Sequence, residues 1–345
     1  MPRELIADKP GSTVLREYEE APLNPDQVRA KTVYSAVKHG TEFRGFQANT
    51  LDASDRFDWE WRMHMRGQRQ PETAFPKRLG NMYVAEVIEV GSDVTGVQLG
   101  DRIFGHASVR ETHTVSGDKI EKIPEGVSWK ALMYTDPASV AVNGIREGNI
   151  RLGDRVAVFG LGAIGLMAAQ CAKVAGASWV AAIDPIERRC SAAEAHGADV
   201  VFDPREVDVG LEIKKITGKL GVDVAMETSG SAQAMYDALR CTRYQGTVVS
   251  TAYYNRPMEG LNFTGEWHRN RIRIIACRSA SEPYPDYGWD IKRNDQLAND
   301  LLFAGKLKAD NLLDPIVAFE DVAEAYLQMN EHPETAIKLG VDHSL

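Results

Sequence analysis

A chain of 345 residues is long enough for two domains, or for one domain inserted into another. With 43% hydrophobic and 26% charged residues, its composition excludes a disordered or fibrous chain. The formal net charge of -9, without any basic run interleaved with aromatic residues, opposes binding to a phosphate backbone. We therefore expect no nucleic-acid partner.

The amino-terminal residues, MPRELIADKP, have no basic stretch followed by an apolar one. No window approaches the roughly 18 consecutive apolar residues of a membrane helix. We therefore expect a cytoplasmic protein without a membrane partner. The four cysteines are widely spaced and form no C-x-x-C motif, so we expect reduced thiols in the core.

Short runs of alternating hydrophobic residues at 28–36 and 83–90, separated by Pro, Gly and Asn, predict a barrel-like β domain. The polar, aromatic segment 47–78 between them is too long for an ordinary connection, and such segments are typical of lids and binding loops. We assign Trp59 and His64 to the substrate on this basis. The alternative is a surface loop that Trp59 and Trp61 anchor to the core.

From Arg155 onward, apolar strands alternate with helical segments, which predicts an α/β fold with a doubly wound parallel sheet. Near-continuous apolar strands are expected where helices cover both faces of a sheet. The predicted strands are 155–160, 178–184, 222–230 and 246–252, and helices are expected from Ala163, over 186–198, and again over 295–307 and 320–329.

A G-x-G-x-x-G motif follows the strand at 155–160 and opens the next helix. Gly160 permits the tight turn, Gly162 lets the backbone approach a pyrophosphate, and Gly165 allows close packing of the helix. The N–H groups at the start of the helix face the phosphates. The motif assigns to the cofactor Gly160, Leu161, Gly162, Ala163, Ile164 and Gly165.

Asp184 ends the second strand, about 20 residues beyond the glycines, where a carboxylate accepts hydrogen bonds from the adenosine ribose. The same carboxylate repels a 2′-phosphate, so we expect NAD as the cofactor rather than NADP. Arg189, close behind, can offset part of that repulsion by pairing with a phosphate. We assign Arg189, Ser229 and Thr251 to the cofactor as well.

Five phrases resemble the medium-chain dehydrogenase/reductase superfamily: SAVKHGTE (35–42), LGNMYVAEVIEVGSDV (79–94), GDRIFG (100–105), DPASVA (136–141) and TAIKL (335–339). DPASVA is most similar to the polyol and sorbitol dehydrogenase branch. The resemblance implies a GroES-like β-barrel catalytic domain, 1–136 with 280–345, and an inserted Rossmann domain, 137–279, that binds NAD. It also implies a homodimer or homotetramer through the edge of the Rossmann sheet, at 271–277.

Zinc-dependent members of that superfamily have Cys-Gly-Ser/Thr-Asp where this chain has His39-Gly40-Thr41-Glu42, and Gly-His-Glu where it has Gly80-Asn81-Met82. A third ligand position holds Asp136. A catalytic zinc normally needs three protein ligands, and His39 with Asp136 does not supply them. The four-cysteine lobe that binds structural zinc in many relatives would lie near 104–109, where no cysteine occurs. We therefore expect no metal.

Without zinc, cationic or hydrogen-bonding side chains must stabilise the charge that develops on the substrate oxygen. The resemblance places Lys38, His39, Thr41 and Asp136 around the reacting group, and Asn81 against the substrate. Thr41 matches the hydroxyl that relays the proton in zinc-containing relatives. The structural alternatives are a solvated charge for Lys38, a core residue for His39 and a helix N-cap for Asp136.

These features together predict a zinc-independent, NAD-dependent oxidoreductase that interconverts a secondary alcohol, in a polyol, sugar or cyclitol, and its ketone. A second hypothesis is an NADPH-type quinone or enoyl reductase, against which Asp184 argues. A third is a nucleotide-binding protein without catalysis. Selectivity for NAD or NADPH distinguishes the first hypothesis from the second. Binding of NAD without turnover of any alcohol or ketone would identify the third.

Overall fold

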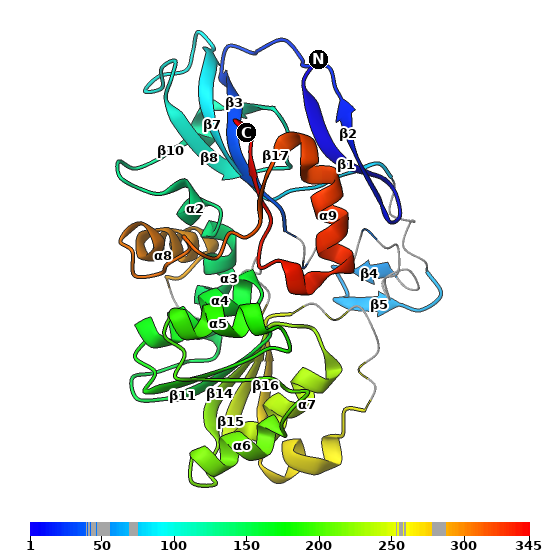
Figure 1. Cartoon of the computed structure of the whole chain (residues 1–345), viewed down its shortest axis with the longest axis vertical. Helices are drawn as coiled ribbons and strands as arrows, with labels where there is room; N and C mark the ends of the chain where they lie inside the picture. The colour runs from blue at the N-terminus through cyan, green and yellow to red at the C-terminus, as the bar shows by residue number, and fades with distance from the viewer. Residues whose placement is uncertain are drawn as a thin grey trace. The chain divides into compact units, whose positions relative to one another are not determined.

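The computed structural model describes residues 1–38, 40, 42, 46, 56–68, 75–252, 254, 258, 260–277 and 288–345. The chain forms two compact units, which we call unit 1 (Met1–Met133 with Leu313–Leu345) and unit 2 (Tyr134–Leu312). Figure 1 shows that both chain ends belong to unit 1. None of the helices in the described part of the chain has the length and hydropathy of a membrane span.

The two largest sheets of unit 1 together contain strands from both chain ends. The larger sheet has the order β10-β8-β7-β3-β18-β17, and β9 also pairs with β3. Its strands are β3 (Gln27–Ala36), β7 (Met82–Val90), β8 (Arg102–His106), β9 (Thr112–Ser116), β10 (Glu121–Lys122), β17 (Ile316–Ala318) and β18 (Gly340–Asp342). The smaller sheet has the order β2-β1-β6, from β1 (Arg3–Lys9), β2 (Ser12–Glu17) and β6 (Lys77–Arg78).

The strands predicted at 28–36 and 83–90 are β3 and β7, which pair in antiparallel fashion. Their alternating apolar residues, among them Val28, Ala30 and Val87, are buried in one hydrophobic cluster, as expected for strands with one face toward a core. The described parts of unit 1 contain the helices α2 (Trp129–Leu132) and α9 (Val322–Glu331) and the 3-10 turns η2 (Gly117–Lys119), η4 (Phe319–Asp321) and η5 (Pro333–Thr335). Gly40, Glu42 and Phe46 are helical as well.

Unit 2 contains a six-stranded parallel sheet of order β13-β12-β11-β14-β15-β16. In order of sequence within the sheet this is 3-2-1-4-5-6, the Rossmann arrangement, so the predicted fold class is confirmed. The strands are β11 (Arg155–Phe159), β12 (Trp179–Ile183), β13 (Val200–Phe202), β14 (Val222–Glu227), β15 (Thr242–Ser250) and β16 (Arg273–Ala276).

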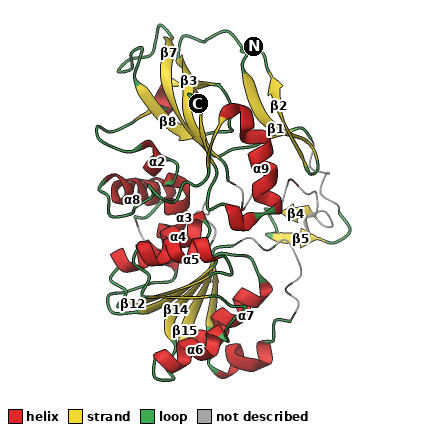
Figure 2. Cartoon of the chain, viewed as in Figure 1, coloured by secondary structure: helices red, strands yellow, loops and turns green. Residues whose placement is uncertain are grey.

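Helices cover both faces of this sheet, which explains its near-continuous apolar strands. Figure 2 shows α3, α4 and α5 on one side of the sheet and α6 and α7 on the other. The helices of unit 2 are α3 (Thr135–Glu147), α4 (Ala163–Val174), α5 (Glu187–Ala195), α6 (Val209–Ile216), α7 (Ala232–Cys241) and α8 (Ile291–Phe303), with a π-helical turn, η3 (Phe263–Trp267).

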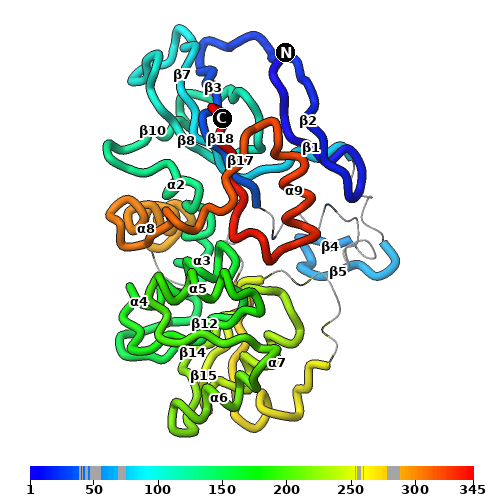
Figure 3. Tube along the Cα trace, in the orientation of Figure 1, coloured from blue at the N-terminus to red at the C-terminus, as the bar shows by residue number. Residues whose placement is uncertain are grey.

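The boundary between the units differs from the one expected at 279/280. The chain returns to unit 1 only after Leu312, because α8 packs on α3 inside unit 2. There the buried amide of Asn294 donates to the carbonyl oxygen of Ser139 at 2.9 Å. The tube in Figure 3 follows this return, from orange α8 to red α9. The first boundary, at 133/134, lies close to the expected 136/137.

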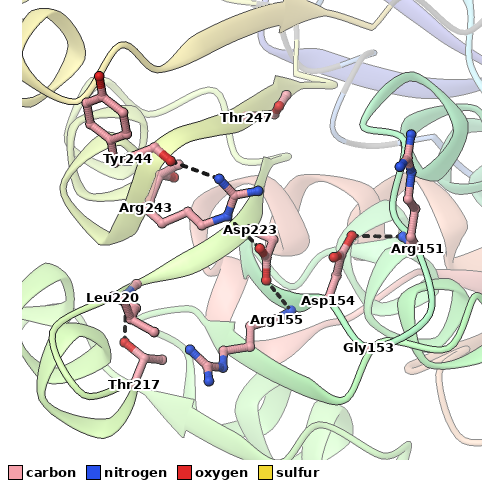
Figure 4. A network of polar contacts seen from close by, with 12 residues as sticks. Arg151, Gly153, Asp154, Arg155, Thr217, Leu220, Asp223, Arg243, Tyr244 and Thr247 are labelled. Carbon is pink, nitrogen blue, oxygen red and sulfur yellow. Dashed lines mark hydrogen bonds and ion pairs between the residues drawn. The ribbon is translucent and has the colours of Figure 1, made fainter.

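A polar network at the amino ends of β11, β14 and β15 holds these strands together (Figure 4). The carboxylate of Asp223 accepts hydrogen bonds from the backbone N–H of Arg155 at 2.9 Å and from Nε of Arg243 at 2.5 Å. The network lies at the amino ends of the strands, whereas the glycine motif lies at their carboxyl ends. Ligands of open parallel sheets bind at the carboxyl ends of the strands, so the candidate site is there.

All four cysteines, Cys171, Cys190, Cys241 and Cys277, are free and buried, which confirms that they are reduced core residues. Burial raises the pKa of Cys171, Cys241 and Cys277 to about 12 and that of Cys190 to about 11. They are therefore thiols near neutral pH and poor nucleophiles.

Candidate active site

The glycine motif forms a tight turn between β11 and α4. Gly160 has a φ of 87°, a left-handed conformation that glycine adopts readily. A Cβ on Gly165 would lie only 1.8 Å from the carbonyl oxygen of Gly160, so close packing of the helix requires glycine there. A Cβ on Gly162 would meet no protein atom within 4 Å, so protein packing does not explain this glycine. Close approach by a ligand does explain it.

Helix α4 begins at Ala163 with Gly162 as its N-cap and has no capping side chain. The N–H groups of its first turn are thus available to an anion. Leu161 is fully buried and belongs to the scaffold of the turn, whereas Ile164 is partly exposed. The geometry suits a pyrophosphate, and the assignment of these residues to the cofactor stays a prediction.

Asp184 ties the end of β12 to the glycine turn. Its Oδ2 accepts a hydrogen bond from the backbone N–H of Leu161 at 2.7 Å, and its Oδ1 accepts one from Ile186 at 2.9 Å. The guanidinium of Arg189 lies 3.8 Å from Oδ2. Each carboxylate oxygen has a second lone pair, so Asp184 can still accept hydrogen bonds from ribose hydroxyls.

The sequence reasoning missed Glu227, which ends β14 and is fully buried. Its carboxylate accepts hydrogen bonds from the backbone N–H of Ser229 at 2.8 Å and of Gly230 at 3.1 Å, and from the Ser229 hydroxyl. Burial raises the pKa of Glu227, and these donors oppose the rise. The available signal was an acidic residue at the end of an apolar strand, the same pattern that identified Asp184.

Thr251, the other predicted cofactor residue at this edge, follows β15. Its N–H and its hydroxyl donate to the backbone carbonyl of Glu227, at 2.9 and 3.1 Å. Ser229 and Thr251 therefore both contact Glu227, and the structure brings them together at the carboxyl ends of β14 and β15.

In unit 1, Glu42 joins the two segments to which the resemblance assigns the reacting groups. Its Oε2 accepts a hydrogen bond from the N–H of Lys38 at 3.1 Å, and its Oε1 accepts one from Gly80 at 2.6 Å. The N–H of Glu42 in turn donates to the carbonyl of Lys38 at 3.0 Å. His39 and Thr41, two of the predicted catalytic residues, lie outside the described residues.

Lys338 and Tyr326 contact the residues around Glu42, and neither was given a role from the sequence. Lys338 is only 1% exposed, and its ammonium donates to the carbonyl of Val37 at 2.7 Å. The hydroxyl of Tyr326 lies 3.5 Å from Oε2 of Glu42. Burial raises the pKa of Glu42, and the N–H groups of Gly80 and Lys38 and the charge of Lys338 oppose the rise. Glu42 and Lys338 occur in the phrases HGTE and TAIKL, which were singled out in the sequence for their resemblance to the superfamily.

The donor set of the described residues does not fit a catalytic zinc. Asn81 offers a neutral amide oxygen, and Met82 is fully buried in β7. Within the described ranges, no group of three His, Cys, Asp or Glu side chains is placed to hold a metal ion. His39 is outside those ranges, so the absence of zinc stays a prediction.

Asp136 belongs to unit 2, where it is the second residue of α3 and half-buried. The helix begins at Thr135 with Tyr134 as its N-cap, so the interpretation of Asp136 as the N-cap is wrong. A carboxylate in the first turn is still stabilised by the helix dipole.

The predicted substrate segment contains a hairpin of β4 (Arg56–Asp58) and β5 (Met63–Met65). Trp59 is 66% exposed and Trp61 is 70% exposed, so the alternative that they anchor the segment to the core is wrong. The ring of His64 packs on Phe57 at a centroid distance of 5.1 Å. The rest of the predicted lid, residues 47–55 and 69–74, lies outside the described residues.

Comparisons with known proteins agree with this architecture. Residues 163–291 match the family model "Zinc-binding dehydrogenase". The chain is 43% identical to the D-guloside 3-dehydrogenase of Escherichia coli (strain K12), over 98% of this chain and 99% of that protein. It is 27% identical to sorbitol dehydrogenase 1 of Saccharomyces cerevisiae, over 73% and 77%. The chain belongs to the medium-chain dehydrogenase/reductase superfamily.

Within this superfamily the chain falls in the polyol dehydrogenase branch, so it is an oxidoreductase of the alcohol and polyol dehydrogenase type, from a group that uses nicotinamide cofactors. The crystal structure of 2R,3R-butanediol dehydrogenase from Bacillus subtilis has the same fold, with a TM-score of 0.76, 21% identity and 99% of each chain covered. The residues matched to the zinc-binding family model, 163–291, include none of the positions that would hold a catalytic zinc.

Proposed function

We propose that this protein is an NAD-dependent dehydrogenase that oxidises the C3 hydroxyl of a hexopyranoside to a ketone, without zinc. The observation that carries the proposal is the 43% identity, along nearly the whole of both chains, to an enzyme named for that reaction on D-gulosides. Asp184 supports NAD, because its buried carboxylate at the end of β12 repels a 2′-phosphate.

The glycine turn and Asp184 would hold NAD⁺, which would supply the acceptor for the hydride of the carbinol carbon. As the ketone forms, the substrate hydroxyl also loses its proton. The chain must receive that proton and stabilise the charge on oxygen. We assign the hydrogen bond to this oxygen to Thr41, and the positive charge or the proton acceptor to Lys38 or His39. We assign Asp136 to the reacting group as well, since a carboxylate favours the charged state of a cationic partner.

We assign Asn81, Trp59 and His64 to the substrate. Asn81 is held by two backbone hydrogen bonds, to Ala36 at 2.9 Å and from Ala107 at 3.0 Å, which support its amide at the start of β7. The exposed ring of Trp59 offers a flat apolar face of the kind on which a pyranose ring packs.

The test of the proposed function is oxidation of methyl D-gulopyranoside, other methyl hexopyranosides and free polyols, each with NAD⁺ and with NADP⁺. We expect turnover of at least one glycoside with NAD⁺ and a 3-keto product by NMR. Turnover of polyols alone would refute the glycoside assignment, and preference for NADP⁺ would refute the cofactor assignment.

Zinc independence is tested on the same active protein. We expect elemental analysis to find no stoichiometric zinc, and activity to survive dialysis against a chelator. Thr41→Val should lower turnover by a factor of about 100 to 1,000, the usual cost of removing one preorganised donor. Stoichiometric zinc whose removal abolishes activity would overturn the assignment, and unchanged turnover in Thr41→Val, His39→Ala and Lys38→Met would show that the chemistry lies elsewhere.

We also propose that the chain forms a homodimer or homotetramer through β16. This strand is at the edge of the sheet of unit 2, pairs with β15 on one side, and exposes Ile274. An exposed apolar edge strand is a surface that proteins usually cover. The measurement is the molar mass in solution by light scattering, and a monomer would refute this proposal.

A further inference from the structure

The carboxyl ends of β14 and β15 hold a polar cluster, which we call the Glu227 cluster: Glu227, Ser229, Ser250, Thr251 and Tyr254. In a Rossmann sheet the first three strands bind the adenosine half of a dinucleotide, and the second three bind the nicotinamide half. β14 and β15 belong to the second three. The Glu227 cluster therefore lies at the nicotinamide half of the candidate cofactor site, and Ser229 brings it against the glycine turn.

Tyr254 closes this cluster. Its ring packs against the hydrophobic core of unit 2, and its hydroxyl donates a hydrogen bond to Oε2 of Glu227. The hydroxyl of Ser250 donates to Oη of Tyr254 at 3.1 Å. Three polar side chains thus form a directed series, from Ser250 through Tyr254 to Glu227. The hydrogen bond from Tyr254 is the stronger kind, because its acceptor is a buried carboxylate.

The loop after β14 rests on the glycine turn and depends on Glu227 for its shape. The hydroxyl of Thr228 donates to the carbonyl of Gly160 at 2.7 Å, and a Cβ on Gly160 would lie 2.7 Å from Cβ of Ser229. On the other side, Oε1 of Glu227 accepts the N–H groups of Ser229 and Gly230. The loop is therefore held between the phosphate turn and the carboxylate of Glu227.

We propose that Glu227 and Tyr254 are positioning residues for the nicotinamide end of the cofactor. The carboxylate of Glu227 holds the loop after β14, and it also accepts the hydrogen bond from Tyr254. Residues 228–230 and the side chain of Tyr254 then keep the arrangement that receives the nicotinamide riboside. This inference rests on the proposed binding of NAD, and neither residue was assigned to the cofactor from the sequence.

The test compares NADH with ADP, which contains the adenosine and pyrophosphate but lacks the nicotinamide riboside. Tyr254→Phe keeps the packed ring and removes only the hydroxyl, and Glu227→Gln removes the charge. We expect either variant to bind NADH about tenfold more weakly, the usual size of a lost hydrogen bond to a charged group. ADP affinity should fall much less, since the predicted direct contacts of ADP lie at the glycine turn and Asp184. Both affinities are measured by calorimetry.

The matched control is Tyr244→Phe, the same substitution near the amino end of β15, whereas Ser250 of the cluster ends that strand. Tyr244 is exposed and is labelled in Figure 4. It should change neither affinity. Equal losses for NADH and ADP in Tyr254→Phe would show a purely structural role and overturn the inference, as would full NADH affinity. If Glu227→Gln does not fold, Tyr254→Phe still decides the question. A wild-type protein that binds neither ligand would instead refute the proposed cofactor site.

Discussion

The backbone N–H of Gly80 donates a hydrogen bond of 2.6 Å to Oε1 of Glu42, and the same carboxylate accepts the N–H of Lys38. Glu42 thus connects the segment of Lys38 to the segment of Gly80 and Asn81 that leads into β7. In zinc-dependent relatives, the resemblance implies, a metal ion is shared by these two segments. Here the carboxylate of Glu42 connects them, and the charge of the buried Lys338 favours its ionised form. The link predicts that Glu42 positions the reacting groups.

Glu42→Gln tests this prediction. A glutamine amide has one oxygen, so the N–H of either Gly80 or Lys38 loses its acceptor, at a cost of about 1–3 kcal/mol in the free energy of unfolding. We expect turnover to fall about tenfold or more, because misplacement of the reacting groups is costly. NADH affinity should stay constant, because its predicted contacts lie in unit 2. Glu89→Gln, which changes an exposed carboxylate, is the control.

The double variant Glu42→Leu/Lys338→Met separates positioning from stability. The charge of Lys338 favours the ionised form of Glu42, so removing one buried charge removes a stabilising interaction of the other, whereas removing both is often neutral for stability. We expect Lys338→Met alone to be strongly destabilised in urea unfolding and the double variant to recover part of the loss. Turnover should not recover with it. A double variant that regains both would mean that Glu42 serves only the fold.

Asp184→Ser should change cofactor preference. Without the carboxylate, Arg189, which lies 3.8 Å from Asp184, becomes available to a 2′-phosphate. We expect a gain in NADPH affinity and a loss in NADH affinity, both measured by fluorescence titration. Adding Arg189→Met should remove the gain. NADPH affinity equal to that of NADH in the wild-type protein, or no gain in Asp184→Ser, would refute the role of Asp184.

Two glycines of the same motif should respond differently to alanine. Gly165→Ala places a Cβ 1.8 Å from a backbone oxygen, so we expect a large loss of thermal stability. Gly162→Ala meets no protein atom within 4 Å, so Tm should change little while NADH affinity falls. Calorimetry gives both quantities. Unchanged NADH affinity in Gly162→Ala would contradict close approach of the pyrophosphate at that residue.

Two histidines of unit 1, the buried His113 and the half-buried His343, should weaken the fold in acid. Burial lowers the pKa of His113 to about 3, helped by the charge of Arg110, and burial lowers that of His343 to about 4. The unfolded chain binds these protons below about pH 6.5, whereas the folded chain does not, so stability falls as the pH drops from there toward 4. Each fully uncompensated proton costs about 1.4 kcal/mol per pH unit.

His113→Phe preserves a ring that can stack on Tyr83, now 3.8 Å away between centroids, and removes one of these protons. We expect a shallower decline of the urea midpoint between pH 6.5 and 4.5. Replacing the exposed His332 by Asn is the control and should leave the slope as in the wild-type protein. An unchanged slope in His113→Phe would show that His113 does not carry the acid sensitivity.

Local pattern was sufficient for much of this protein. The apolar strands of unit 2 show their period and their end points directly, and Gly160, Gly165 and Asp184 occur at spacings that one turn geometry requires. These features depend on neighbours in sequence, so they can be deduced without coordinates. The same holds for β3 and β7, whose alternating residues identify one buried face.

The boundary at Leu312 and the roles of Glu42, Lys338, Glu227 and Tyr254 required the tertiary structure. α8 looks like any amphipathic helix in sequence, and only its packing on α3 assigns it to unit 2. Lys338 is almost 300 residues from Glu42 along the chain, so no local pattern relates their charges. A buried charge needs a partner, because burying an unpaired charge costs free energy. Which residue becomes that partner depends on how distant segments of the chain pack together.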